Sequence, residues 1–254
     1  EIYDLVLEMK KLGIVFAALV GILPSWLYCL LSVFLPVSVY CFLTNALPMS
    51  DQGIRNDGGV LYGIAKDDDT TAVALSLLQI QAELYAGKSP AEISPSLYFE
   101  LPQLPEDDAN FLLLLSARYA YYLDAGDAEN ANKVSERIFS VKKYVPKVFL
   151  DQVNADLLYN ASAVNKSEYE ADDLMDYAEK YLNGEETASN MRIKAAYVLY
   201  VVGDREKADR LIARGEELCD AERIPGIAKM ERKLLAAMKE ATPETETPSP
   251  AEEG

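Results

Sequence analysis

Near its start the chain has a long apolar stretch without charge. From Leu12 to Ser50 every side chain is uncharged, whereas a single membrane crossing needs about 20 apolar residues. The stretch therefore corresponds to nearly two crossings, or to one crossing and a re-entrant segment. Proline lacks an N–H and clashes with the preceding helical turn, so Pro24 and Pro36 are the natural points for a kink or turn. We expect two transmembrane helices, one near residues 12–33 and a shorter one near 34–47.

After residue 63 the pattern changes to that of amphipathic helices. The segment Asp67-Asp68-Asp69-Thr70 carries side chains that cap helix N-termini, and apolar residues then recur at three- and four-residue intervals. This pattern predicts a helix over residues 71–86, closed by Gly87. Prolines between residues 88 and 108 predict a loop with at most a short helical turn near 91–99.

From residue 109 onward the apolar spacing predicts a series of helices separated by short turns. Their expected positions are near 109–125, 128–141, 146–160, 168–183, 188–202, 205–219 and 225–240. In two segments a helix rich in Ala and Tyr precedes a Gly-Asp turn, Gly126-Asp127 and Gly203-Asp204, and these turns lie 77 residues apart, about two units of 38. Helical-hairpin repeats have periods of about 34 to 47 residues. The sequence therefore predicts an all-α protein with a tetratricopeptide-like stack over 109–240, or alternatively a plain helical bundle there.

Composition narrows the functional classes. The formal net charge is −17, almost all of it after residue 50, and such an acidic surface repels phosphate backbones, which argues against a nucleic-acid partner. The chain contains no histidine, so histidine-based catalysis and histidine-ligated metals are excluded within it. Its three cysteines show no spacing typical of a disulfide framework or a zinc ribbon. The acidic, proline-broken tail of residues 241–254 is expected to be disordered.

Asp57 is the ionisable residue in the most unusual setting, because it lies shortly after the apolar stretch and directly before Gly58 and Gly59. The two glycines allow the backbone to turn tightly and to approach a partner closely. If this segment folds back to the membrane face, the Asp57 carboxylate can ligate a cation such as zinc. The alternative interpretation is a surface turn, for which Asn-Asp-Gly is a favoured sequence.

The segment Asn45-Ala-Leu-Pro48 at the end of the apolar stretch, followed by Asn56-Asp57-Gly58-Gly59, resembles the third core motif of site-2 proteases, which are intramembrane zinc metalloproteases. The resemblance covers residues 12–90, because bacterial members also carry a soluble helical region directly after the motif. It implies that Asp57 is the third zinc ligand. Supporting roles are implied for Asn45, Pro48, Asn56, Gly58 and Gly59.

The other two zinc ligands of that family are the histidines of a His-Glu-x-x-His motif, which this chain lacks. The resemblance therefore implies either the C-terminal part of a larger enzyme or a catalytically inactive relative. In either case no catalytic residue lies in this chain, which is inactive when isolated.

Two functions are compatible with the sequence. The first is a part of a site-2-protease-like metallopeptidase, with zinc as its metal and a soluble helical domain that binds a substrate or regulator. The second is a membrane-anchored helical-repeat scaffold that binds a protein or peptide segment without catalysis. Both are integral membrane proteins. Basic residues before the apolar stretch (Lys10, Lys11) and after it (Arg55, Lys66) favour two crossings with the helical domain in the cytoplasm.

Overall fold

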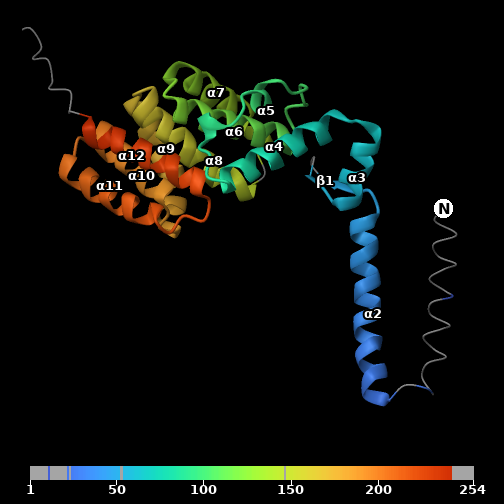
Figure 1. Ribbon diagram of the computed structural model, residues 1–254. Coiled ribbons are helices and arrows are strands. Elements are labelled where there is room, and N and C mark those ends of the chain that lie inside the picture. The colour runs from blue at the N-terminus through green and yellow to red at the C-terminus, as the bar shows by residue number, and fades with distance from the viewer. Residues whose placement is uncertain (1–10, 12–21, 23, 52–53, 146, 242–254) are drawn as a thin grey trace, which may run out of the picture. The chain divides into compact units, whose positions relative to one another are not determined.

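The computed structural model describes residues 11, 22, 24–51, 54–145 and 147–241 (Figure 1). The chain separates into two compact units. The N-terminal unit extends to residue 65, and the C-terminal unit comprises residue 66 onward together with residues 52–54. The expected disordered tail and much of the expected helix near 12–33 lie outside the described residues.

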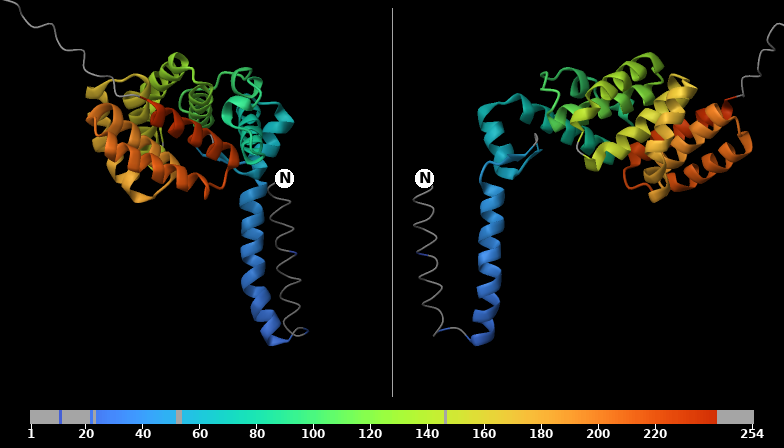
Figure 2. Two further views of the ribbon diagram at one scale, coloured as in Figure 1. Left: turned by 60° about the vertical axis from the view of Figure 1, so that its left-hand side comes forward. Right: turned by 180° about the vertical axis from the view of Figure 1, so that it is seen from behind.

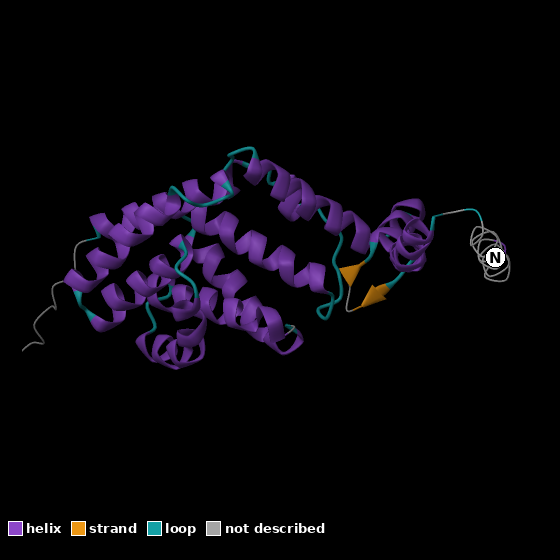
Figure 3. Cartoon of the chain, turned by 90° about the horizontal axis from the view of Figure 1, so that it is seen from below, coloured by secondary structure: helices purple, strands orange, loops and turns teal. Residues whose placement is uncertain are grey.

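The described chain is helical apart from one ribbon of two short strands (Figure 3). Its first elements are α2 (Ser25–Ala46), β1 (Ser50–Asp51), β2 (Ile54–Arg55) and α3 (Asp57–Lys66). They are followed by α4 (Asp69–Tyr85), η2 (Pro90–Glu92), α5 (Ser96–Phe99), α6 (Ala109–Ala125), α7 (Ala128–Val141), η3 (Lys142–Tyr144), α8 (Lys147–Tyr159), η4 (Asn160–Val164), α9 (Glu168–Gly184), α10 (Ala188–Tyr197), η5 (Val198–Val202), α11 (Arg205–Cys219) and α12 (Pro225–Glu240). The all-α class predicted from the sequence is therefore confirmed for the described residues.

The apolar helix α2 differs from the expectation. It runs without interruption from Ser25 to Ala46, so the expected break near residues 33–34 is wrong. Pro24 directly precedes the helix, where a proline removes no helical hydrogen bond, and Pro36 removes only one N–H from the interior. No residue of α2 is buried. Among the described helices, only α2 is long and apolar enough to cross a membrane.

In the C-terminal unit, consecutive helices pack in pairs (Figure 2). Helix α6 packs with α7, α8 with α9, and α10 with α11, while α12 lies against α10, α11 and α4. One cluster of buried apolar side chains runs through these helices, because each buries its apolar face against its neighbours. The helices predicted between residues 109 and 240 are all present in the structure.

The two Gly-Asp turns have the same backbone geometry. Gly126 and Gly203 end their helices with φ values of 75° and 78°, which glycine adopts without steric cost. The side chains of Asp127 and Asp204 then cap the next helices by accepting from the N–H three residues later, at 3.1 and 2.9 Å. The likeness of the two segments therefore extends from the sequence to the backbone.

Two of the helices end in a widened turn. Helix α8 continues into the π-helical turn η4 and α10 into η5, and the first residues of these turns, Asn160 and Val198, lie 38 residues apart. This separation equals the period inferred from the Gly-Asp turns. The middle and the last of these helix pairs therefore share this backbone feature.

A buried ion pair connects α10 to α12. Nε of Arg192 donates to Oε2 of Glu231 at 2.6 Å, and the two side chains are 3% and 2% exposed. The guanidinium carbon of Arg192 also lies 4.0 Å from the ring centroid of Tyr159 in α8. Burial acts to lower the pKa of Arg192, but the combined effect of Glu231, Tyr159 and Asp156 outweighs it, so the pKa is raised above its usual value. The charged guanidinium therefore links three helices within the core.

Candidate functional site

The sequence Asn56-Asp57-Gly58-Gly59 begins helix α3, so the surface-turn interpretation of this segment is wrong. Asn56 is the capping residue: its Oδ1 accepts from the N–H of Gly59 at 2.9 Å, and its carbonyl oxygen accepts from the N–H of Val60 at 3.0 Å. Asparagine is among the best residues at this position because its side chain satisfies an N–H that the helix leaves open. Asp57 is consequently the first residue of a helix.

The same Asn56 side chain also binds the end of α2. Its Nδ2 donates to the carbonyl oxygen of Leu47 at 2.6 Å and to that of Thr44. Its Oδ1 accepts a further hydrogen bond from the N–H of Met49 at 3.0 Å. The last carbonyls of a helix have no partner within the helix, so Asn56 satisfies groups at the end of α2 and the start of α3 together. This double cap fixes the junction of the two helices.

Gly58 and Gly59 allow the two helices to approach at backbone distance. A Cβ at Gly58 would lie 2.3 Å from the carbonyl oxygen of Ala46 and 2.9 Å from that of Asn45. A Cβ at Gly59 would lie 2.8 Å from the carbonyl oxygen of Met49. These separations are shorter than van der Waals contact, so only glycine fits at either position.

Pro48 and Asn45 shape the end of α2. Leu47, the residue before Pro48, has extended dihedrals of φ −76° and ψ 131°, as expected before proline, and the helix ends there. The Nδ2 of Asn45 donates to the carbonyl oxygen of Cys41 in the preceding turn at 2.8 Å. The carboxamide of Asn45 is therefore tied to its own helix.

Asn45 and Asp57 line one shallow, open hollow of about 390 Å³. Its remaining lining residues are Cys41, Phe42, Ala46, Gly58 and Leu61. The structure thus brings together Asn45 and Asp57, two of the three polar residues that the resemblance implicates, whereas Asn56 is not part of this lining. Their polar atoms stand in an otherwise apolar setting.

The carboxylate of Asp57 is available for a ligand. Its side chain is exposed, and no hydrogen bond or ion pair to it is found among the described residues. The positive end of α3 favours a negative charge at this position. A carboxylate oxygen is an accepted zinc ligand, but a zinc site needs about four ligands. The described residues contain no group of three His, Cys, Asp or Glu side chains able to hold a metal ion.

Comparison of the chain with protein-family models, with curated proteins and with solved structures gives no match.

Sequence reasoning singled out Asp57 and its neighbours as candidate site residues but missed the helix that Asp57 begins. The available signal was Asn56, a favoured capping residue, followed by apolar residues at Val60, Leu61 and Ile64. Two adjacent glycines obscured it, because glycine disfavours a helix by about 1 kcal/mol relative to alanine. The double contact of Asn56 was not visible in the sequence at all.

Proposed function

We propose that this chain is the C-terminal part of a site-2-protease-like intramembrane zinc metallopeptidase, in which Asp57 supplies the third zinc ligand. One observation carries the proposal. The carboxylate of Asp57, which no described residue engages, stands at the first residue of a helix that is locked, at backbone distance, to the end of an apolar helix of membrane-spanning length. A surface turn would require neither the close approach nor the double cap.

In this proposal α2 lies in the membrane. A helix that is apolar on all sides is stable only when protein or lipid covers it. No residue of α2 is buried by the described chain, which supports lipid or further membrane helices as its surroundings. We also propose a second crossing before α2 and a cytoplasmic location for the helical domain, on the distribution of Lys and Arg around the apolar stretch.

The residues of this chain hold and orient one ligand. The carboxylate of Asp57 is the proposed ligand, and Asn56 fixes the backbone on either side of the junction. Gly58 permits the close packing that keeps Asp57 at the end of α2. When bound, zinc would polarise the scissile carbonyl and activate a water molecule. The two histidine ligands and the base would come from a His-Glu-x-x-His segment of a longer polypeptide.

The experiment begins with the reading frame upstream of Glu1, which should encode His-Glu-x-x-His within a hydrophobic segment. In the longer polypeptide, Asp57→Ala should reduce bound zinc and abolish cleavage of a transmembrane substrate while the helical domain stays folded. Asp69→Ala is the matched control, because Asp69 is the exposed first residue of α4. Absence of the upstream motif, or zinc content and cleavage that survive Asp57→Ala, would show that the proposal is wrong.

For residues 109–240 we propose a tetratricopeptide-like stack that binds a substrate or a regulator. The supporting observations are three successive helix pairs, α6–α7, α8–α9 and α10–α11, and the regular spacing of their turns. Repeats of this kind bury their faces only against their neighbours, and α12 covers the last pair.

The second candidate function, a membrane-anchored scaffold without catalysis, rests on the same helix pairs. It needs α2 and the helical domain but no zinc, so the upstream sequence distinguishes the two. If that sequence lacks His-Glu-x-x-His, the scaffold is the better proposal. Failure of residues 71–240 to capture any protein or peptide partner would count against the scaffold.

A further inference from the structure

Helix α4 of the C-terminal unit has apolar residues on two opposite sides (Figure 1). On one side Val73 and Ile80 are buried, and this side packs against α5, α6 and α12. On the other side Leu75, Leu78 and Tyr85 are 43%, 58% and 54% exposed. A helix on the surface of a domain usually carries polar residues on the side that faces water. The outer side of α4 therefore has the composition of a contact surface.

The exposed side of α4 has the spacing of a surface that packs on another helix. Four apolar residues follow one another there at intervals of three, four and three positions: Leu75, Leu78, Ala82 and Tyr85. We call these four residues the α4 seam. The same intervals separate the core positions of helices that pack along their length. Because each residue turns the helix by 100°, the four lie within about 80° of one another around the axis. The α4 seam therefore fits a second helix better than a small molecule.

The α4 seam lies in an uncharged segment. No residue from Thr70 to Ala82 carries a charge, although the formal net charge of the chain is −17. A charged group of a partner would find no counter-charge on this segment, so the seam favours neither an acidic nor a basic peptide. Copies of a strongly acidic protein repel one another. An uncharged apolar seam is a place where two such copies can meet at low electrostatic cost.

The α4 seam is complementary to itself. In an antiparallel pair with a two-fold axis at the level of Ile80, residue 78 of one copy lies level with residue 82 of the other. Leu78 then faces the partner's Ala82, and Leu75 lies level with the partner's Tyr85. Large side chains opposite small ones allow two helices to interdigitate. A two-fold arrangement also uses the same surface on both copies, so no second seam stays exposed.

We propose that this chain forms a symmetric dimer in which the α4 seams of two copies pack against each other in antiparallel orientation. The second copy covers apolar side chains that would otherwise form an exposed patch and promote aggregation. The dimer involves neither zinc nor catalysis. It is therefore compatible with the metallopeptidase part and with the scaffold.

The mass of the whole chain in detergent micelles tests the dimer. Light scattering should give a protein mass of twice 28.1 kDa. Leu78→Glu brings a negative charge from each copy into the seam, so it should raise the dissociation constant at least about tenfold. Phe139→Glu is the matched control, because it adds the same charge at a position on α7 that is 61% exposed. This control should leave the dimer intact.

Disulfide cross-linking tests the orientation of the two helices. Cys29 and Cys41 are first replaced by serine, because both are exposed. Under mild oxidation, Leu78→Cys chains mixed with Ala82→Cys chains should form mixed disulfide dimers, since facing residues lie within the reach of a disulfide. Leu78→Cys chains mixed with Phe139→Cys chains should not. Circular dichroism checks that each variant is folded.

Three results of the mass measurement would overturn the proposal. They are a wild type that is monomeric at every concentration, a dimer that survives Leu78→Glu, and a dimer that Phe139→Glu dissociates equally. Absence of the mixed disulfide between Leu78→Cys and Ala82→Cys chains would overturn the antiparallel pairing. A monomeric chain that binds an added amphipathic helix through the seam would assign this surface to another protein.

Discussion

Gly58 and Ala46 are in contact through their backbones: a Cβ placed on Gly58 would lie 2.3 Å from the carbonyl oxygen of Ala46. The first turn of α3 therefore rests directly on the last turn of α2. Asn56 adds hydrogen bonds to both helices at the same point. The position of Asp57 depends on this junction, and its integrity can be measured without any assay of activity.

Gly58→Ala should open the junction. The added methyl group has no room beside Ala46, and overpacking of this kind costs about 1–3 kcal/mol. We expect faster hydrogen exchange of the α3 amides in the whole chain. Gly184→Ala is the control, because nothing lies within 4 Å of a Cβ there. Equal exchange in the two variants would contradict the close contact.

Two substitutions of Asn56 should separate its role as the cap of α3 from its hydrogen bonds to the end of α2. Asn56→Asp keeps the oxygen that caps α3 but loses the donor to Leu47 and Thr44, whereas Asn56→Ala loses both. Loss of an N-cap costs about 0.5–2 kcal/mol. Hydrogen exchange of the Gly59 amide should therefore be slow in the wild type and in Asn56→Asp but fast in Asn56→Ala. A fast-exchanging Asn56→Asp would mean that the contact with α2 is what holds α3.

Removing only one side chain of the buried Arg192–Glu231 pair should lower the free energy of unfolding strongly. Glu231→Ala leaves a buried guanidinium without its partner, which typically destabilises a protein by about 3–5 kcal/mol. Denaturant unfolding measures the change. Glu206→Ala, which removes an exposed partner of Arg210, should cost less than about 1 kcal/mol. The double variant Arg192→Met/Glu231→Leu should be more stable than Glu231→Ala, and the opposite order would contradict a dominant charge penalty.

Asp156 should make folding stability depend on pH. Burial raises its pKa to about 6 in the folded protein, an effect that Arg192 opposes and Glu231 reinforces, whereas an unfolded Asp has a pKa near 3.9. The folded state binds the proton more tightly, so this carboxyl lowers stability progressively as the pH rises from about 4 to 6.

Asp156→Asn mimics the protonated form and should therefore stabilise the protein at pH 7, by about 1–2 kcal/mol once partial exposure is allowed for. The gain should vanish below about pH 4. Unfolding at pH 7 and pH 4 measures it, with Asp151→Asn as an exposed control on the same helix. A destabilised Asp156→Asn at pH 7 would contradict the raised pKa.

The helices after residue 109 were predictable because residues at or next to each helix end determine where it begins and ends. Gly126 and Gly203 mark helix ends, and the aspartates that follow them mark helix starts. Between these points the spacing of the apolar residues indicates a helix. Such signals act between residues close in sequence. The structure therefore reproduces these helices with small shifts at their ends.

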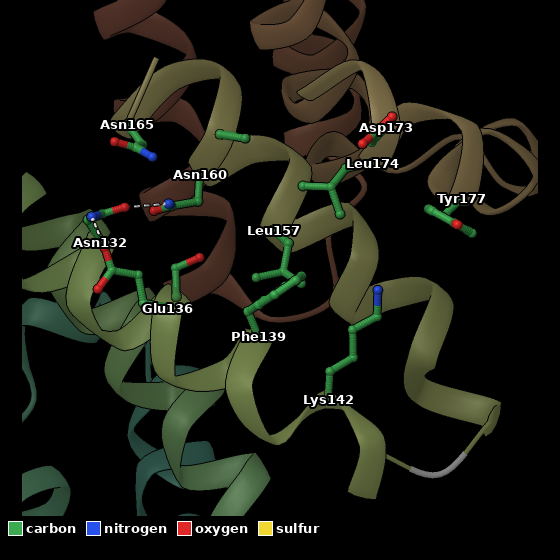
Figure 4. Close-up of a pocket in the computed structure, with 12 residues that line it drawn as sticks. Asn132, Glu136, Phe139, Lys142, Leu157, Asn160, Asn165, Asp173, Leu174 and Tyr177 are labelled. Atoms are coloured by element: carbon green, nitrogen blue, oxygen red, sulfur yellow. Dashed lines mark hydrogen bonds between the residues drawn. The ribbon is translucent and has the colours of Figure 1, made fainter. Parts of the chain in front are cut away.

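The rest depended on contacts that no local pattern contains. Helix α3 has glycines at its second and third positions because α2 lies against them. Helix α2 continues through Pro36 because a single lost N–H does not stop a long apolar helix. A pocket of about 470 Å³ is lined by residues of α7, α9 and the end of α8, so it also depends on how separate helices pack (Figure 4). Packing between helices, rather than propensity within them, decides each of these features.

The π-helical turns that end α8 and α10 also bear on how the chain tolerates changes in length. A π turn accommodates about one residue more than an α turn, so residues 160–164 and 198–202 each contain a surplus residue. Loss of one residue there would restore ordinary helical winding without rotating the buried face of the preceding helix. Elsewhere in these helices a deletion would turn that face by about 100°. Single-residue deletions during evolution should therefore be accepted first at these two points, while the packing of the helix pairs is preserved.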